Sequence, residues 1–199
     1  MNSKFGIFLL PDKKVEKFIF SQKEVFKSIV KSHKYLDHLV HLTLFVFDSN
    51  NDNKNKILQR FNNLKINENK ILVDTIGWKV FKNDVLTKLN TLYLGIEKSD
   101  ELSKLQEILI TTFKEFSIKK IDNNLGSEFY RNKIEFGYPY VRDSWIPHIT
   151  IGSLDIDESQ IFNQIKRTEI EFKDISFKNI SLYKIDGDKH TELCSIKLN

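Results

Sequence analysis

The most informative segments of the chain are HLTLF at residues 41–45 and HITIG at residues 148–152. In both segments a histidine and a threonine stand two positions apart among residues that favour β-strands. Successive side chains of a strand point to opposite faces, so each histidine shares a face with its threonine, and the apolar residues between point into a core. We therefore predict two strands, each presenting an imidazole and a hydroxyl group about 7 Å apart on an unpacked face.

Strands and helices alternate on both sides of these segments. Apolar residues at three- and four-residue spacing predict amphipathic helices, and short alternating or apolar runs predict strands. The expected strands cover residues 5–10, 38–47, 71–81, 91–96, 146–153, 170–183 and 191–198, and the expected helices cover 15–30 (with a break near Ser21), 57–64, 102–116 and 161–165. Polar loops are expected at 48–56 and 121–127, and Asp186-Gly187 fits a hairpin turn. This order is typical of an α/β or α+β protein with strand–helix–strand units in both halves.

The composition limits the class of protein. The chain has 199 residues, of which 40% are hydrophobic, enough for the core of one large domain or two closely packed lobes. The net charge of +4 suits an anionic ligand but is far below that of a dedicated nucleic-acid coat. Cys194 is the single cysteine, which excludes an intrachain disulfide framework and a multi-cysteine zinc site. The single cysteine suits a reducing cytosol, so we expect a cytoplasmic protein. No apolar run reaches the roughly 20 residues of a membrane span, so we expect no membrane partner.

Two histidines suit the cleavage of a phosphodiester. In-line displacement needs a base for the attacking oxygen and an acid for the leaving oxygen, on opposite sides of phosphorus. Histidine takes either role near neutral pH, and a neighbouring threonine hydroxyl can donate a hydrogen bond to a phosphoryl oxygen. The two His-x-Thr pairs supply all four groups, so we expect neither a metal ion nor a cofactor.

These residues resemble the signature of the 2H phosphoesterase superfamily. The superfamily includes bacterial 2′-5′ RNA ligase-like proteins, plant and yeast cyclic phosphodiesterases, and viral enzymes that destroy 2′-5′ oligoadenylates. His41-Leu42-Thr43 matches its first motif, and Pro147-His148-Ile149-Thr150 matches its second, including the proline that often precedes the second histidine. The resemblance covers most of the chain.

The resemblance implies both a fold and a site. The fold would be α+β and bilobal with pseudo-twofold symmetry, with two antiparallel sheets flanked by helices around a central cleft. Residues 1–199 would form a single domain with one His-x-Thr strand in each lobe. His41 and His148 would be the catalytic acid–base pair, and Thr43 and Thr150 would bind the phosphate.

Two features lie outside the shared motifs. The bacterial RNA ligase-like branch often carries a basic residue just after its second motif, whereas this chain has Gly152-Ser153-Leu154 there. Upstream of the second motif, Tyr140, Arg142 and Trp145 are candidates for substrate binding, by stacking on a base or by neutralising a phosphate.

The remaining reactive residues have simpler explanations. His33 and His190 are expected at the surface. His38 and His41 stand three positions apart on a predicted strand and point to opposite faces, which argues against a metal pair. Cys194 lies in an alternating strand and is expected to pack as a small core residue. The sequence contains no glycine-rich dinucleotide motif and no P-loop.

The sequence therefore predicts a metal-independent phosphodiesterase that hydrolyses a 2′-linked or 2′,3′-cyclic phosphodiester in an RNA-derived or nucleotide substrate. Its partners would be nucleotides, cyclic nucleotides or short RNA. Two alternatives stay open. An enzyme of the same kind would degrade cyclic or 2′-5′ oligonucleotide immune signals in viral or phage counter-defence. A non-catalytic protein of the same fold would sequester nucleotides and release them unchanged.

Overall fold

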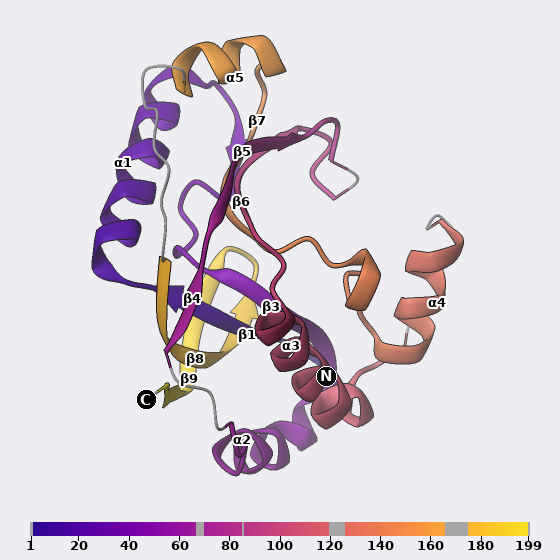
Figure 1. The fold of residues 1–199 in the computed structure, drawn as a ribbon. Helices are drawn as coiled ribbons and strands as arrows, with labels where there is room; N and C mark the ends of the chain where they lie inside the picture. The colour runs from indigo at the N-terminus through magenta and orange to yellow at the C-terminus, as the bar shows by residue number, and fades with distance from the viewer. Residues whose placement is uncertain (1, 67–69, 85, 120–125, 166–174, 199) are drawn as a thin grey trace.

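A computed structural model describes residues 2–66, 70–84, 86–119, 126–165 and 175–198 (Figure 1). The strands are β1 (Asn2–Pro11), β2 (His33–Lys34), β3 (Leu42–Asn50), β4 (Ile71–Val73), β5 (Thr75–Phe81), β6 (Asn90–Ile96), β7 (His148–Leu154), β8 (Ile175–Asp186) and β9 (Lys189–Lys197). The α-helices are α1 (Lys13–Ile29), α2 (Lys54–Asn62), α3 (Asp100–Phe113), α4 (Ser127–Phe136) and α5 (Glu158–Ile165). Three short 3-10 turns are η1 (Asn51–Asn53), η2 (Lys114–Phe116) and η3 (Arg142–Ser144).

The expected order of strands and helices is confirmed, with differences at the element ends. The helix expected at 15–30 runs unbroken through Ser21, whose hydroxyl donates to the carbonyl of Phe18 within the helix. The strand expected at 71–81 is divided at Asp74 into β4 and β5. The sequence patterns missed β2 and α4. The expected loop at 121–127 and the start of the strand expected at 170–183 lie largely outside the described residues.

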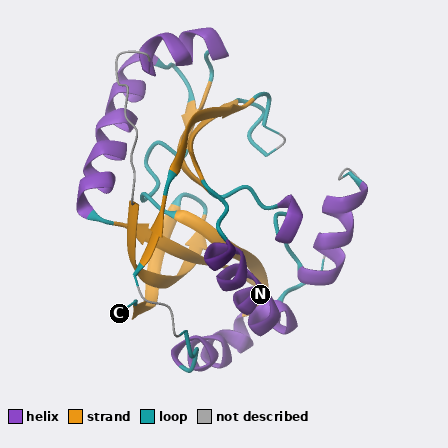
Figure 2. Cartoon of the chain, in the orientation of Figure 1, coloured by secondary structure: helices purple, strands orange, loops and turns teal. Residues whose placement is uncertain are grey.

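The strands form an antiparallel sheet in two halves. The strand order is β4-β8-β1-β3-β7-β6-β5, with β2 also pairing with β7 and β9 with β8. The two halves meet where β3 pairs with β7, at Leu42 opposite Ile149. Figure 2 shows the strands in the middle of the molecule and the helices around them. The α+β fold is therefore confirmed, but the described strands form one nine-stranded antiparallel sheet rather than the two sheets expected, because the pairing of Leu42 with Ile149 joins the halves.

The two halves repeat the same local design. In one half Phe8 of β1 pairs with Thr43, and in the other Tyr93 of β6 pairs with Thr150. Directly after each threonine the motif strand carries one extra residue, which produces a β-bulge at the same place in both halves. A bulge increases strand twist and redirects the neighbouring side chains. The pseudo-twofold relation is thus present in the pairing register although the sequence shows no repeat.

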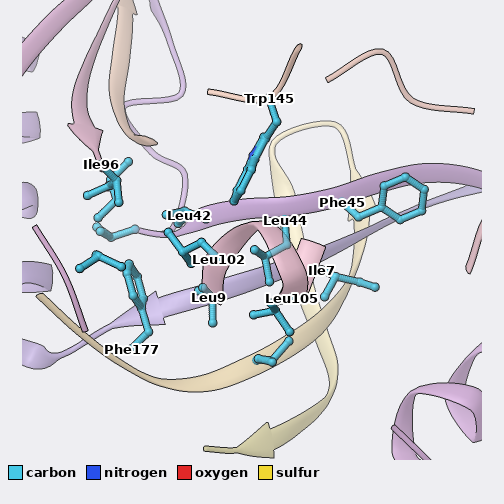
Figure 3. Packing of buried hydrophobic residues seen from close by; sticks show 14 of the residues in the cluster. Ile7, Leu9, Leu42, Leu44, Phe45, Ile96, Leu102, Leu105, Trp145 and Phe177 are labelled. Atoms are coloured by element: carbon cyan, nitrogen blue, oxygen red, sulfur yellow. The ribbon is translucent and has the colours of Figure 1, made fainter. Parts of the chain in front are cut away.

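The halves also interlock. Helix α1 follows β1 of the first half but contacts β7 of the second, and α3 follows β6 but contacts β3. Asp12 caps α1 by accepting hydrogen bonds from the backbone amides of Lys14 and Val15, and Ser99 caps α3 in the same way. Both helices bury an apolar face, and Figure 3 shows Leu102 and Leu105 of α3 in the cluster that contains Leu42 and Leu44. Each helix therefore fixes the motif strand of the opposite half.

The described part of the chain contains no helix that is long and apolar enough to cross a membrane.

Candidate active site

The pairing of β3 with β7 brings the two His-x-Thr motifs together. Antiparallel pairing of Leu42 with Ile149 places His41 across from Thr150 and Thr43 across from His148. Leu42 and Ile149 are fully buried, whereas the two histidines and the two threonines are only partly buried. The alternation predicted from the sequence is confirmed, and the four polar side chains share one face of the junction between the halves.

Both imidazoles are held in the same way. Nδ1 of His41 lies 2.9 Å from the carbonyl oxygen of Leu39, and Nδ1 of His148 lies 2.7 Å from that of Ile146. A carbonyl oxygen only accepts, so Nδ1 carries the hydrogen in both rings. Nε2 is then the nitrogen that can take up or release a proton at the junction.

An aromatic pair lies behind each imidazole. The ring of His41 packs on Phe8 with centroids 4.0 Å apart, and Phe8 packs on Tyr183 at 5.4 Å. In the other half His148 lies 5.0 Å from Tyr93, which stacks on Phe81 at 4.1 Å. The second ring of each pair comes from the neighbouring strand at an equivalent position. Tyr183 is the strand partner of Gly6, two residues before Phe8, and Phe81 is the strand partner of Thr91, two residues before Tyr93. These aromatic pairs fix the plane of each imidazole.

The charges around the two histidines differ. Burial, together with the neighbouring His190, Lys23 and His38, lowers the pKa of His41 to about 3, although its hydrogen bond to Leu39 acts in the opposite direction. Burial also lowers the pKa of His148, but its hydrogen bond to Ile146 and the carboxylate of Asp84 act in the opposite direction. His41 thus lies among basic groups, whereas His148 faces an acidic one.

Trp145 belongs to the core. Its side chain is 4% exposed, and the indole Nε1 donates a 3.0 Å hydrogen bond to the carbonyl oxygen of Thr43. Figure 3 shows the indole directly beside β3. A buried ring offers no face to a nucleobase, so the predicted contact of Trp145 with substrate is corrected to a structural role in fixing the first motif strand.

Arg142 has a partner in the fold. Nε and Nη2 donate to the two carboxylate oxygens of Glu107 at 2.9 and 2.7 Å, and the guanidinium lies 4.6 Å from the ring centre of Phe136. Its backbone amide donates to Gln106, whose side-chain amide donates in turn to the carbonyl of Leu44. Gln106 thus links the segment before the second motif to β3, the strand of the first motif. A contact of Arg142 with phosphate stays a prediction.

Tyr140 is half-buried within a group of aromatic residues. Its ring makes edge contacts at 5.5 Å with both Phe129 and Tyr138. Burial raises the pKa of Tyr140, and the carboxylate of Asp84 adds to this shift. The pKa of Tyr35 is raised by burial and then by Asp84. Tyr35, Tyr140 and His148 are therefore all within electrostatic reach of the Asp84 carboxylate.

Two histidines that the sequence patterns did not assign to the site lie beside His41. The ring of His190, expected at the surface, lies 5.8 Å from that of His41 and 4.6 Å from that of His38. The turn between β8 and β9 brings His190 there, and Nε2 of His38 pairs with Asp188 of the same turn at 2.9 Å. This approach depends on strand register, and only the Asp186-Gly187 turn signal pointed to the hairpin.

Gly152 allows the loop that carries Tyr35 and His38 to pack closely against β7. A Cβ atom at this position would lie 2.5 Å from Cδ2 of Leu36, which is fully buried. Leu36 belongs to the loop that carries Tyr35 and His38. The glycine after the second motif therefore admits the side chain that anchors this loop against β7.

Neither a metal site nor a reactive thiol is indicated. Within the described ranges, no group of three or more histidine, cysteine, aspartate and glutamate side chains could hold a metal ion. Burial raises the pKa of Cys194, which is partly buried on β9 and packs against the core. A raised pKa disfavours the thiolate, so the expectation that Cys194 is a packing residue fits its surroundings.

Comparisons with known proteins agree with this fold. Residues 20–189 match the family described as the 2′-5′ RNA ligase superfamily. Among solved structures, TT0787 of Thermus thermophilus is 16% identical, with a TM-score of 0.64 over 98% of this chain and 97% of that chain. E. coli LigT in complex with 3′-AMP is 12% identical, with a TM-score of 0.62 over 100% of this chain and 99% of that chain. No match was found among curated proteins.

The family match covers far more than half of the sequence and includes both His-x-Thr motifs, which the fold brings together at the junction of its halves. The chain therefore belongs to the 2′-5′ RNA ligase superfamily of 2H phosphoesterases.

Proposed function

We propose that this protein hydrolyses a 2′-linked or 2′,3′-cyclic phosphodiester in an RNA-derived or nucleotide substrate, without a metal ion. Membership of the superfamily supports phosphoesterase- or ligase-type activity. The observation that carries the finer proposal is the junction itself. Two imidazoles with equivalent Nδ1 hydrogen bonds lie next to two threonine hydroxyls on one face.

In the proposed mechanism the phosphate lies between His41 and His148. Nε2 of a neutral His41 takes a proton from a water molecule as the water oxygen attacks phosphorus. Nε2 of a protonated His148 donates its proton to the leaving oxygen as the ester bond breaks. The hydroxyl groups of Thr43 and Thr150 donate hydrogen bonds to the non-bridging oxygens, where negative charge increases.

The surrounding charges support this division of roles. Basic neighbours favour the neutral form of His41, which is the form that a general base needs. The carboxylate of Asp84 favours the protonated form of His148, which is the form that a general acid needs. A bound phosphate would favour the protonated form of both rings.

Nucleotide binding by a structural relative supports a nucleotide ligand for this chain. E. coli LigT has been solved with 3′-AMP, with ATP and with NADP+. By analogy we assign the half-buried rings of Tyr35 and Tyr140 to stacking on the base of a nucleotide or short RNA. The interlocked halves support a single bilobal domain over residues 1–199. The single cysteine supports a reducing cytoplasmic setting.

Product analysis tests the proposal. The protein would be incubated with EDTA and a panel of 2′,3′-cyclic nucleotides, 2′-5′ and 3′-5′ dinucleotides and cyclic oligonucleotides, and the products identified by mass spectrometry. We expect cleavage of a 2′-linked or cyclic substrate by the wild type and by a His33→Ala control, and none by a His41→Ala, His148→Ala double variant. Equal cleavage by the double variant would disprove the mechanism. Recovery of unchanged ligand from a tight complex would favour the sequestering function.

A further inference from the structure

Three imidazole rings gather on the first half of the site. His190, on the strand after the β8–β9 turn, lies 4.6 Å from His38, 5.8 Å from His41 and 5.9 Å from Phe8, measured between ring centres. Of these three histidines, the mechanism above uses only His41. We call His38 and His190 the histidine pair.

A buried ammonium group lies behind the histidine pair. Lys23 of α1 is 1% exposed, and its Nζ donates to the carbonyl oxygens of Tyr35 at 2.7 Å and of His38 at 3.1 Å. These carbonyls accept two of the three hydrogens of the ammonium group without neutralising its charge. Lys23 therefore adds a positive charge directly beneath the loop that carries His38.

The hydrogen bonds of the histidine pair leave one donor site open. Asp188 accepts from Nε2 of His38 through its carboxylate and from Nδ1 of His190 through its backbone carbonyl, at 2.9 and 3.1 Å. Nδ1 of His190 thus carries a hydrogen, and none of the described residues forms a hydrogen bond with its Nε2. On protonation this nitrogen becomes a second donor next to His41.

Among the described residues, no second imidazole lies beside His148 in the opposite half. Across the junction His148 faces the carboxylate of Asp84, which accepts from the hydroxyl of Thr91. An anion is repelled there, whereas the histidine pair lies beside the ammonium group of Lys23, and the carboxylate of Asp188 on that side is already bonded to His38. The Asp188 carboxylate is bonded to His38, which leaves Nε2 of His190 without a described partner, and on protonation this nitrogen becomes a charged donor of the kind that binds a phosphate group.

We propose that the histidine pair, backed by Lys23, is a second phosphate subsite, which binds a further phosphate of a nucleotide substrate whose scissile phosphate lies between His41 and His148. This inference rests on the proposed function for the position of the scissile phosphate. It specifies a substrate with at least two phosphates, oriented so that the second lies on the His41 side. The phosphate accepts a hydrogen bond from Nε2 of a protonated His190, and its negative charge offsets the positive charge of Lys23.

Equilibrium binding tests the subsite independently of turnover. Calorimetry would compare adenosine 2′-monophosphate with adenosine 2′,5′-bisphosphate and adenosine 3′,5′-bisphosphate, because these probes share one base and differ in their phosphates. We expect at least one bisphosphate to bind wild type about ten-fold more tightly than the monophosphate, the gain from one charge-assisted contact. His190→Gln should abolish this gain, and His33→Gln, a histidine outside the pair, should retain it.

Proton uptake provides a second readout that a structural role of His190 would not affect. The titratable groups that face His190 are His38, His41, Lys23 and Asp188. Titrations in two buffers of different ionisation enthalpy should show more protons taken up with the bisphosphate than with the monophosphate, and this difference should vanish in His190→Gln.

Equal affinities for the mono- and bisphosphates in wild type would overturn the subsite, as would a gain that persists in His190→Gln or a failure of every probe to bind. The proposed hydrolysis is tested separately by product analysis. Turnover without a bisphosphate gain would overturn the subsite alone, and a gain lost in His190→Gln without turnover would overturn only the hydrolysis.

Discussion

The half that carries His41 and the half that carries His148 share a backbone design but differ in charge. Each has a bulged motif strand, an imidazole held through Nδ1 by a carbonyl two residues earlier, and an aromatic pair behind the ring. Around His41 the neighbours are histidines and a lysine, whereas His148 faces Asp84. Symmetry of the backbone thus places two imidazoles in equivalent positions, and side chains outside the motifs surround them with different charges.

Removal of either histidine should have the largest effect. His41→Ala and His148→Ala are each expected to lower kcat/KM at least about 100-fold on a substrate with an unactivated leaving group, because each ring carries one of two required proton transfers. Steady-state kinetics in EDTA would measure the loss, and thermal unfolding would verify that the variants fold. A decrease of kcat/KM in only one of the two variants would contradict a catalytic role for the histidine of the other half.

Trp145 is expected to have the next largest effect. Trp145→Phe removes the hydrogen bond to the carbonyl of Thr43 but keeps an aromatic ring in the core. We expect a loss of about 1 kcal/mol of unfolding free energy and about a ten-fold decrease in kcat, because the first motif strand is less firmly placed. Urea unfolding and steady-state kinetics would measure the two losses.

Trp78→Phe is the matched control for this variant. Nε1 of Trp78 is buried without a hydrogen-bond partner among the described residues, so its removal breaks no such bond. Equal losses of kcat in Trp78→Phe and Trp145→Phe would contradict a positioning role of the Trp145 hydrogen bond.

Asp84 should determine the alkaline side of the pH profile. Its carboxylate raises the pKa of His148, so Asp84→Asn should lower that pKa. A general acid is active while protonated, and activity is lost as the pH rises through its pKa. The alkaline limb of kcat/KM should therefore move to lower pH in Asp84→Asn. A shift of the acidic limb alone would assign Asp84 to the other histidine.

Lys23 should produce the smallest effect, on the pH dependence of stability. Burial lowers its pKa from 10.5 to about 8 in the folded protein. Between these values the unfolded chain binds more protons than the folded one, so the unfolding free energy should rise with pH from about 8 to 10.5. Urea unfolding of wild type against Lys23→Met isolates this contribution. Identical pH dependence in both proteins would contradict a depressed pKa of Lys23.

The motif residues could be predicted from the sequence because their signal is local. Alternation along HLTLF and HITIG determines which side chains share a face, and the fold confirms that arrangement at Leu42 and Ile149. The order of helices and strands followed from apolar spacing for the same reason.

The environment of each histidine could not be predicted. His190 reaches His41 only through the register of the β8–β9 hairpin, and Lys23 lies beneath the site only because α1 packs across the molecule. Trp145 was predicted at the substrate because its ring type suits stacking, yet a bond to the carbonyl of Thr43 directs it inward. These placements depend on long-range packing, which a single sequence does not reveal.

The measurement that tests the central claim most directly compares two variants on a substrate with an activated leaving group. A nucleoside 4-nitrophenyl phosphodiester releases a leaving group that needs no protonation, so it removes the requirement for a general acid. The account predicts that His148→Ala regains most of the wild-type kcat/KM on this substrate, while His41→Ala stays at least about 100-fold impaired. Recovery of His41→Ala instead, or equal impairment of both variants, would contradict the assignment of His41 as base and His148 as acid.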